Sequence, residues 1–299
     1  MSPACKRIND PMNICRFNDR RIGLVRGFNV HDVTDLVGLS HVEPVLGAPK
    51  VLSALSEQAL ARTPVLPLAS VTLLSPILAP GKILAAPDNY RAHTAEMQAD
   101  TAASFGRVPT PLENAGLFLK APSSLVGPSA GVTRRFPSRR TDYEVELVAI
   151  IGETAADLDP RRALDIVAGY AIGLDITVRG PEDRSFRKSL DTYTVVGPWM
   201  TCADQIPDPQ QLTMSLTLNG EVKQQTVLTD MVTDVRGLIA YASTFAVLQP
   251  GDMIFTGTPA GVGPIQSGDV IVAEIDAIGR MQVAVRDYVA PAPRDKGTP

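Results

Sequence analysis

The chain has 299 residues, of which 44% are hydrophobic and 20% are charged. These values are ordinary for a folded globular protein and exclude disorder as the main state. The net charge of -4 comes from 28 basic and 32 acidic residues spread along the chain. Because no basic stripe results, nucleic acid is not an expected partner.

Membrane association is not expected either. No segment approaches the roughly 18 to 20 consecutive apolar residues that a spanning helix needs. The first residues lack the apolar core of a secretory signal, so we expect a cytoplasmic protein. The three cysteines, Cys5, Cys15 and Cys202, show no metal-type spacing and are odd in number, which indicates reduced, structural thiols.

The first 75 residues are expected to form a small N-terminal module. Residues 13–33 resemble a hairpin in which Asn18 and Asp19 make the turn between two strand-like segments. Residues 47–62 place apolar side chains at helical spacing, which predicts a helix. Four prolines then mark the expected end of the module: Pro64, Pro67, Pro76 and Pro80.

A larger module is expected over residues 76–290, followed by a mobile tail at residues 291–299. Short apolar segments between Gly and Pro predict the strands KILAA, GLFLK, YEVELVAII, LTMSLTLNG, DMIFTG and DVIVAEI. Helices are expected at residues 160–173, after the capping residue Asp159, and at residues 235–248. Because strands outnumber helices and do not alternate with them, the sequence predicts a strand-rich α+β fold.

The segment around Glu144 predicts a β-strand with two carboxylates on one face. Side chains alternate along a strand, so Glu144 and Glu146 share a face with the apolar Val148 and Ile150. Like charges at this spacing need compensation when they are buried, and a divalent cation such as Mg²⁺ takes carboxylate oxygens. The alternative is an exposed strand edge whose carboxylates meet water.

Asp175 supplies a third carboxylate. It ends the apolar segment Tyr170–Leu174, and Arg179 follows it four residues later. An acid at a strand end beside an Arg suits a metal site that binds an anionic substrate. An ordinary turn or capping role for Asp175 is the alternative.

A candidate acid–base pair lies in DNYRAHTAEM, which begins at Asp88. On a helix, the side chains of His93 and Glu96 meet, because they are three residues apart. A Glu that orients a His and raises its basicity makes the pair suited to activating water. The alternative is a surface pair without a catalytic part. His31 and His41 have no such partner and are interpreted as structural.

Two further segments carry candidate groups. Lys188 follows Arg184 and Arg187, and neighbouring cations can lower the pKa of a Lys so that it binds a carboxylate or moves a proton. A solvated loop is the alternative. The Gly-rich segment at residues 255–263 lacks the Lys of a P-loop and the spacing of a dinucleotide fingerprint. Its backbone amides can still hold an oxyanion or a carboxylate.

These segments occur in an order that resembles the fumarylacetoacetate hydrolase superfamily across residues 82–285. The matching segments are KILAAPDNYRAHTAEM, LFLKAPSSLVG, DYEVELVAIIG, GYAIGLDITVR, RKSLDTYTVVGPW, LTLNGE and LQPGDMIFTGTPAGVG. The resemblance implies a catalytic domain that is a mixed β-sandwich or roll with flanking helices. It also implies a homodimer, and the N-terminal module is similar in size to the cap segment of this family.

The resemblance assigns two groups of residues to the chemistry. The E-x-E strand and the acid of the D-[IL]-T-x-R segment correspond to Glu144, Glu146 and Asp175, which would bind Mg²⁺ or Mn²⁺. The H-x-x-E pair corresponds to His93 and Glu96, in the role of the dyad that activates water.

Substrate contacts are implied as well. Lys188, from the K-S-x-D segment, and Arg179 would contact the substrate carboxylate and oxyanion. Gly257 and Thr258 match the family's backbone-rich loop at the acid group of the substrate. Tyr90 is a further pocket residue in this comparison.

The implied activity is metal-dependent hydrolysis of a C–C bond in a small β-diketo acid or acylpyruvate. Fumarylacetoacetate-like and fumarylpyruvate-like compounds and 2,4-diketo sugar acids are candidates, which suggests a place in aromatic or sugar acid catabolism. A metal would stabilise the enolate, His93 would take a proton from water, and Lys188 would steady the oxyanion or protonate the leaving carbanion. The expected partner is therefore a small oxo or diketo acid.

Three alternatives share these features. The same enolate chemistry would serve decarboxylation of a β-keto acid such as oxaloacetate, or isomerisation or hydration of an oxo-dienoate. A non-catalytic homologue that keeps the metal site is the third. Its support is a departure from the family pattern. Many members read R-D-x-Q after Arg179, with the Gln in the active site, whereas this chain reads RGPE and has Glu182 at that substrate-binding position. An acid there repels an anionic substrate unless it is protonated or turned away, and the short segment from Glu182 to Lys188 predicts a reduced lid.

Overall fold

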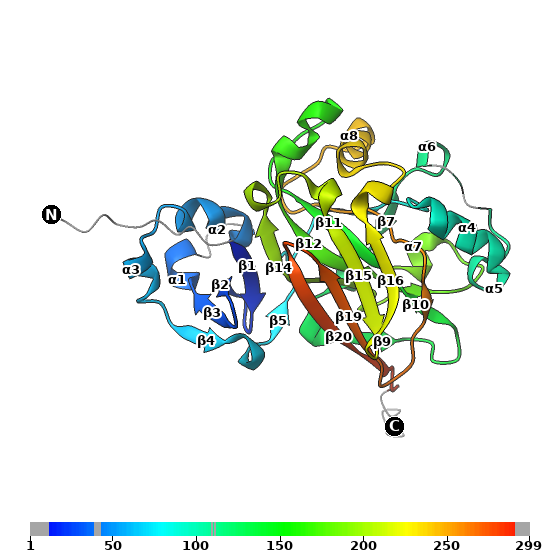
Figure 1. Cartoon of the computed structure of the whole chain (residues 1–299), viewed down its shortest axis with the longest axis horizontal. Helices are drawn as coiled ribbons and strands as arrows, with labels where there is room; N and C mark the ends of the chain where they lie inside the picture. The colour runs from blue at the N-terminus through cyan, green and yellow to red at the C-terminus, as the bar shows by residue number, and fades with distance from the viewer. Residues whose placement is uncertain (1–11, 39–42, 109, 111, 291–299) are drawn as a thin grey trace, which may run out of the picture.

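Long-range strand pairing builds most of the fold, in which a large sheet and a smaller sheet pack face to face (Figure 1). The structure is a computed structural model and describes residues 12–38, 43–108, 110 and 112–290. Three features discussed above lie outside the described residues: Cys5, His41 and the tail at residues 291–299.

The large sheet contains twelve strands of the described chain. They are β1 (Asn13–Phe17), β2 (Arg21–Arg26), β3 (Asn29–Asp32), β4 (Val65–Pro67), β5 (Leu73–Leu74), β6 (Ile83–Ala85), β7 (Phe118–Lys120), β8 (Leu125–Val126), β11 (Val145–Ile151), β12 (Val167–Asp175), β14 (Thr194–Cys202) and β17 (Met253–Phe255). Their order is β4-β3-β2-β1-β14-β12-β11-β17-β6-β7, with β5 on β1 and β8 on β14.

The smaller sheet covers one face of the large sheet. Its strands are β9 (Val132–Arg134), β15 (Thr213–Leu218), β16 (Glu221–Val227), β19 (Val270–Ile275) and β20 (Gly279–Asp287), in the order β16-β15-β19-β20-β9. A third, short sheet has the order β13-β10-β18 and consists of β10 (Thr141–Tyr143), β13 (Thr177–Val178) and β18 (Gly263–Pro264). The two larger sheets share a core that includes Leu147 and Ile172 from one and Leu216 and Val283 from the other.

Helices are short and lie around the sheets. The α-helices are α1 (Thr34–Val37), α2 (Pro44–Leu52), α3 (Glu57–Leu60), α4 (Arg91–Ala99), α5 (Thr101–Ser104), α6 (Leu112–Ala115), α7 (Arg184–Arg187) and α8 (Val235–Phe245). The 3-10 helices span Leu68–Ser70, Pro122–Ser124, Pro128–Ala130, Pro160–Ile166, Ala203–Gln205, Pro209–Gln211 and Leu228–Asp230. In the described part of the chain, none of the helices has the length and apolar character that crossing a bilayer requires. The predicted strand-rich α+β class is confirmed.

The N-terminal segment extends the large sheet. The predicted hairpin is confirmed, because β1 pairs antiparallel with β2 and Asn18 lies in the turn between them. β1 also pairs with β14, where Asn13 lies opposite Thr201. The strands drawn in blue in Figure 1 therefore continue the sheet of the larger module. The division of the chain at residue 75 into separate modules stays a prediction.

The helix predicted at residues 160–173 is wrong beyond Ile166. Asp159 does cap a helical turn, since its side chain accepts a hydrogen bond from the Arg161 amide, but this turn is a 3-10 helix that ends at Ile166. The chain then continues as β12, which pairs with both β11 and β14. Hydrogen bonding on both edges, together with the weak helix propensity of Val and Gly, explains why the strand forms instead.

The helix predicted at residues 47–62 is split into α2 and α3. The second helix has its own cap, because the Ser56 side chain accepts from the Ala59 amide. The helix predicted at residues 235–248 is confirmed as α8, which Asp234 caps in the same way. Cys15 and Cys202 are buried and free, as expected for structural thiols.

The two faces of β11 enter different cores. The predicted strand is interrupted at Glu144, where the chain leaves β10 and enters β11. From there Leu147 and Ala149 face the smaller sheet, whereas Val148 and Ile150 pack with side chains of the N-terminal segment. The predicted alternation of faces is thus observed, and the second face is the one that carries the carboxylates.

Candidate active site

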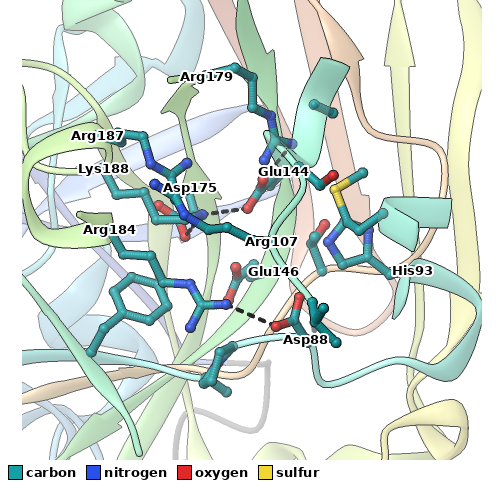
Figure 2. Close-up of a pocket in the computed structure, with 18 residues that line it drawn as sticks. Asp88, His93, Arg107, Glu144, Glu146, Asp175, Arg179, Arg184, Arg187 and Lys188 are labelled. Atoms are coloured by element: carbon teal, nitrogen blue, oxygen red, sulfur yellow. Dashed lines mark hydrogen bonds and ion pairs between the residues drawn. The ribbon is translucent and has the colours of Figure 1, made fainter. Parts of the chain in front are cut away.

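A pocket lies where β11 begins and β12 ends, and α4, α7 and the loop after β17 border it (Figure 2). The structure places seven of the predicted site residues in its lining: Glu144, Glu146, Asp175, His93, Arg179, Lys188 and Thr258. Four more charged residues line it that were not predicted as site residues: Asp88, Arg107, Arg184 and Arg187. Charged side chains from several distant segments meet here, so this pocket is the candidate active site.

Three buried carboxylates form the centre of the pocket. Each of Glu144, Glu146 and Asp175 offers an oxygen, and these oxygens lie within 4.8 Å of one another. Pairing of β11 with β12 brings them together, since Glu146 lies opposite Gly173 and the Asp175 amide donates to the Glu144 carbonyl at 2.9 Å. The side chains are at most 5% exposed. The exposed-edge alternative for the E-x-E strand is therefore excluded.

These acids fit a hard divalent cation. Carboxylate oxygens are the ligands that Mg²⁺ and Mn²⁺ prefer, and buried acids at this distance repel one another without a cation. Glu146 keeps an oxygen for such a role. Its Oε2 accepts from the Gly257 amide at 2.6 Å, and its Oε1 makes no hydrogen bond to the described residues.

Lys188 lies against two of the three acids. Its Nζ donates to Glu144 Oε2 at 2.6 Å, to Asp175 Oδ2 at 2.5 Å and to Thr177 Oγ1 at 2.8 Å. Burial alone would lower the pKa of Lys188, but the attraction of Asp175 and Glu144 raises this pKa above its ordinary value. The prediction that nearby cations lower it is wrong, because carboxylates are its direct partners.

Lys120, at the end of β7, is a buried partner of the site that sequence reasoning missed. Its Nζ donates to Asp175 Oδ1 at 2.5 Å and to the carbonyl of Lys188. Burial lowers the pKa of Lys120, and Asp175 opposes this shift. A signal existed, since Lys120 stands inside the family-matching segment LFLKAPSSLVG. A single Lys after an apolar strand, however, has no spacing that indicates a site.

Arg179 bridges two buried acids. Its Nε donates to Asp142 Oδ2 at 2.9 Å and its Nη2 donates to Glu144 Oε1 at 3.0 Å. Burial opposes its charge, but Glu144 and Asp142 raise the pKa of Arg179. Asp142 also accepts from Arg140. Arg179 therefore holds Glu144 in place, and its contact with a substrate carboxylate stays a prediction.

The two acids of the E-x-E strand have opposite pKa shifts. Burial would raise the pKa of Glu144, yet Lys188 and Arg179 lower it to about 2. Burial, followed by the charge of Asp175, raises the pKa of Glu146 well above its ordinary value. The pKa shifts therefore favour the ionised form of Glu144 and the protonated form of Glu146 in the metal-free protein.

His93 and Glu96 form a hydrogen-bonded pair at one side of the pocket. His93 Nδ1 lies 3.0 Å from Glu96 Oε2, with the His93 side chain 7% exposed. Glu96 is fixed in turn, because its Oε1 accepts from the Gly261 amide at 2.8 Å. The surface alternative for this pair is excluded, since His93 is buried and lines the pocket.

The Gly-rich loop after β17 uses its amides to hold carboxylates of the protein itself. The Gly257 amide binds Glu146 and the Gly261 amide binds Glu96. Thr258 lines the pocket between them, and its Oγ1 accepts from Gln224 Nε2 at 2.9 Å. The loop amides thus bind carboxylates of protein side chains, and the predicted contact of Gly257 and Thr258 with a substrate acid group stays a prediction.

Two predicted substrate contacts lie elsewhere. The Glu182 carboxylate takes two hydrogen bonds from Arg139, at 2.9 and 2.7 Å, and does not belong to the lining of this pocket. Tyr90 is buried beside a neighbouring pocket that includes Asp230, and its hydroxyl has no hydrogen-bond partner among the described residues. Burial, then the charge of Glu146, raises the pKa of Tyr90. Substrate contact by either residue stays a prediction.

Comparison with known proteins decides the family. A family model described as "Fumarylacetoacetate (FAA) hydrolase C-terminal" matches residues 82–286. The chain belongs to the fumarylacetoacetate hydrolase family. The family, the fold class and the enzyme class predicted from the sequence, a hydrolase acting on carbon–carbon bonds of ketonic substances, are confirmed.

Similar proteins match nearly the whole chain. Maleylpyruvate hydrolase of Aquipseudomonas alcaligenes is 46% identical over 285 residues, which cover 92% of this chain and 99% of that protein. The crystal structure of maleylpyruvate hydrolase from Sphingobium sp. SYK-6 has a TM-score of 0.80 and 39% identity, covering 93% of this chain and 100% of that one. Its complex with manganese(II) and pyruvate has a TM-score of 0.79 and 37% identity, with the same coverage.

Replacing Lys120 by Met tests whether its charge compensates the buried acids. Without the ammonium, the metal-free protein is expected to lose about 3 to 5 kcal/mol of unfolding free energy, as when one partner of a buried ion pair is removed. Urea unfolding in EDTA measures this loss. The control is Lys223→Met, which removes the partner of Glu221 in an ion pair that is more exposed than that of Lys120. This change should cost less than about 1 kcal/mol of unfolding free energy. Equal losses in the two variants would contradict the role of Lys120.

Metal binding is expected to release a proton from Glu146. Its pKa is raised in the folded, metal-free protein, so this protein holds a proton that the unfolded chain loses near pH 4.5. Stability of the metal-free form should therefore fall as pH rises through that value. Calorimetric titration with Mn²⁺ in two buffers of different ionisation heat counts the released protons. We expect up to about one proton, declining as pH rises; no release at any pH would show that Glu146 is already ionised.

Proposed function

We propose that the protein uses a divalent cation, Mg²⁺ or Mn²⁺, to hydrolyse a C–C bond of an acylpyruvate of the maleylpyruvate type. The observation that carries this proposal is the meeting of three buried carboxylates with His93 in one pocket, where Glu96 holds the His93 ring. Similarity to the two maleylpyruvate hydrolases supports the substrate class, and the manganese(II) complex of one of them supports the metal.

Glu144, Glu146 and Asp175 would hold the cation. A divalent cation at such a site supplies Lewis acidity, which stabilises negative charge on substrate oxygens. Lys188 and Arg179 favour the ionised form of Glu144, so this proposed ligand is already negatively charged before the cation binds.

His93 is the proposed base. Its Nδ1 is engaged by Glu96, which leaves Nε2 to take a proton from water. The Gly261 amide fixes Glu96, so the ring keeps its orientation as the proton moves. The hydroxide adds to the distal carbonyl carbon, and the C–C bond then breaks with its electron pair leaving on the pyruvate part. The acyl arm is released as a carboxylic acid, and the enolate of the pyruvate part takes up the proton that His93 removed from water.

Lys188 is the proposed electrostatic partner of the leaving group. Its raised pKa favours the protonated form, and its ammonium group donates hydrogen bonds to Glu144 and Asp175 of the proposed metal site. A charged donor at this point stabilises the oxyanion or carbanion that develops when the C–C bond breaks. Arg179 positions Glu144, and Thr258 faces the same pocket as a candidate contact for the substrate acid group.

We propose in addition that the enzyme is a cytoplasmic homodimer, with residues 1–75 as a separate module next to a catalytic domain at residues 76–290. The family resemblance supports the dimer and the module. Gel filtration with light scattering measures the oligomeric state directly.

The metal requirement is tested with EDTA-treated protein assayed on maleylpyruvate with and without added Mg²⁺ or Mn²⁺. Turnover should vanish in EDTA and return with either ion. Glu146→Gln should lower metal affinity and turnover by about 100-fold or more, because a ligand is lost. Glu153→Gln, at an exposed glutamate just past the end of β11, is the matched control and should leave both unchanged. Wild-type metal affinity and turnover in a folded Glu146→Gln protein would refute the proposal.

Removal of the base separates hydrolysis from the alternative activities. His93→Ala should lower maleylpyruvate hydrolysis by about 10² to 10⁴-fold while metal affinity is retained. His31→Ala, in β3 of the N-terminal segment, is the control and should keep full activity. If His93→Ala leaves hydrolysis intact, His93 is not the base. If oxaloacetate decarboxylation exceeds hydrolysis in the wild type and survives this variant, the decarboxylase alternative is favoured instead.

A further inference from the structure

The pocket carries more positive charge than its own acids compensate. Five basic side chains line it, together with four acidic ones. Three of the five bases are paired with carboxylates: Arg179 with Asp142 and Glu144, Arg184 with Asp88, and Lys188 with Glu144 and Asp175. The two that remain are Arg107 and Arg187.

Arg107 and Arg187 donate to the same backbone oxygen. Arg107 Nη2 donates to the Glu182 carbonyl at 2.5 Å and to the Pro181 carbonyl at 2.6 Å, and Arg187 Nε donates to the Glu182 carbonyl at 2.9 Å. Within the described part of the chain, neither guanidinium has a carboxylate at hydrogen-bonding distance. Figure 2 shows both side chains in the pocket that holds the three buried carboxylates.

This arrangement disfavours the charged form of the Arg187 guanidinium. The residue is 4% exposed, and burial, Arg107 and Arg179 together lower its pKa to about 10. The charge of Glu144 opposes this shift only in part. Two neighbouring guanidiniums without a hydrogen-bonded carboxylate are costly, because buried charges need a partner. They also form a ready site for a carboxylate, since planar guanidinium groups bind carboxylates through paired, charge-assisted hydrogen bonds.

We propose that Arg107 and Arg187 bind a second carboxylate, at the far end of the substrate's acyl arm, so that the enzyme acts on acylpyruvates that are dicarboxylates. This inference rests on the proposed function and adds to it the residues that select the acyl arm. The carboxylate of the pyruvate part lies at the metal site, whereas the second carboxylate meets the two guanidiniums. Both sites belong to one pocket, as a single substrate requires.

The charge of the loaded pocket supports a dianionic substrate. With a divalent cation on Glu144, Glu146 and Asp175, the lining would carry a net charge of about plus three. A monocarboxylate acylpyruvate leaves most of this charge without a counterion. A dicarboxylate places its second carboxylate on Arg107 and Arg187, the two arginines without a hydrogen-bonded carboxylate among the described residues.

The test compares a dicarboxylate and a monocarboxylate substrate. Steady-state kcat/KM is measured on the metal-loaded full chain with maleylpyruvate and with acetylpyruvate, which lacks the second carboxylate. Arg107→Gln and Arg187→Gln should each lower kcat/KM for maleylpyruvate by about 10- to 100-fold, mostly through KM, because a charge-assisted hydrogen bond is lost. The values for acetylpyruvate should change by less than about threefold in the same variants.

Two controls accompany these variants. Arg162→Gln removes an exposed arginine remote from the pocket lining and should leave both substrates unaffected. Arg187→Lys keeps the charge but not the planar group, and it should lie between the wild type and Arg187→Gln for maleylpyruvate only. Arg107 is half-buried, so Arg107→Gln remains informative if the change at the buried Arg187 prevents folding.

A second readout is independent of turnover. Calorimetry with maleate, a small dicarboxylate, on EDTA-treated protein should detect binding in the wild type that weakens by about 10-fold or more in Arg107→Gln. Equal kinetic losses on both substrates, or unchanged maleate binding, would overturn the assignment of the two arginines. If the wild type hydrolyses neither maleylpyruvate nor acetylpyruvate, the proposed function itself is refuted. The two failures can therefore be told apart.

Discussion

The burial of three carboxylates at the junction of β11 and β12 is the constraint on which the rest of the site depends. Two acids from one strand face and one from the next strand end cannot share a dry pocket without nearby positive charge. Three side chains from distant segments provide it: Lys120, Arg179 and Lys188. Much of the surrounding architecture, including the return of the chain after β7 and the loop around α7, serves to bring these cations to the acids.

The local sequence pattern was sufficient to place residues whose positions follow from the alternation of side chains along a strand. Alternation around Glu144 placed both glutamates on one face, and the structure shows that face leading into a core distinct from that of Leu147. The acid at the end of β12 was visible for the same reason, because a carboxylate after an apolar run is unusual. Roles for these residues came from the family resemblance and not from the pattern itself.

Features that depend on tertiary contacts could not be predicted from the sequence. The helix predicted at residues 160–173 failed because pairing of β12 on both edges overrides a short helical pattern. The pKa of Lys188 was predicted in the wrong direction because its neighbours in sequence are cations, while its neighbours in space are acids. Lys120, Arg107 and the Arg139 partner of Glu182 have no fixed sequence distance from the groups they contact, so spacing could not reveal them.

The loop from Gly257 to Gly261 separates the proposed metal site from the proposed base pair. One end binds Glu146, a proposed metal ligand, and the other binds Glu96 of the proposed base pair. Both glycines have positive φ angles, of 95° and 101°, and an added Cβ would meet Asn89 at 2.7 Å or the Lys223 carbonyl at 2.0 Å. The loop therefore has little freedom to change shape. A one-residue insertion or deletion there would alter the separation of the proposed cation site and the proposed base while leaving all of their side chains in the sequence.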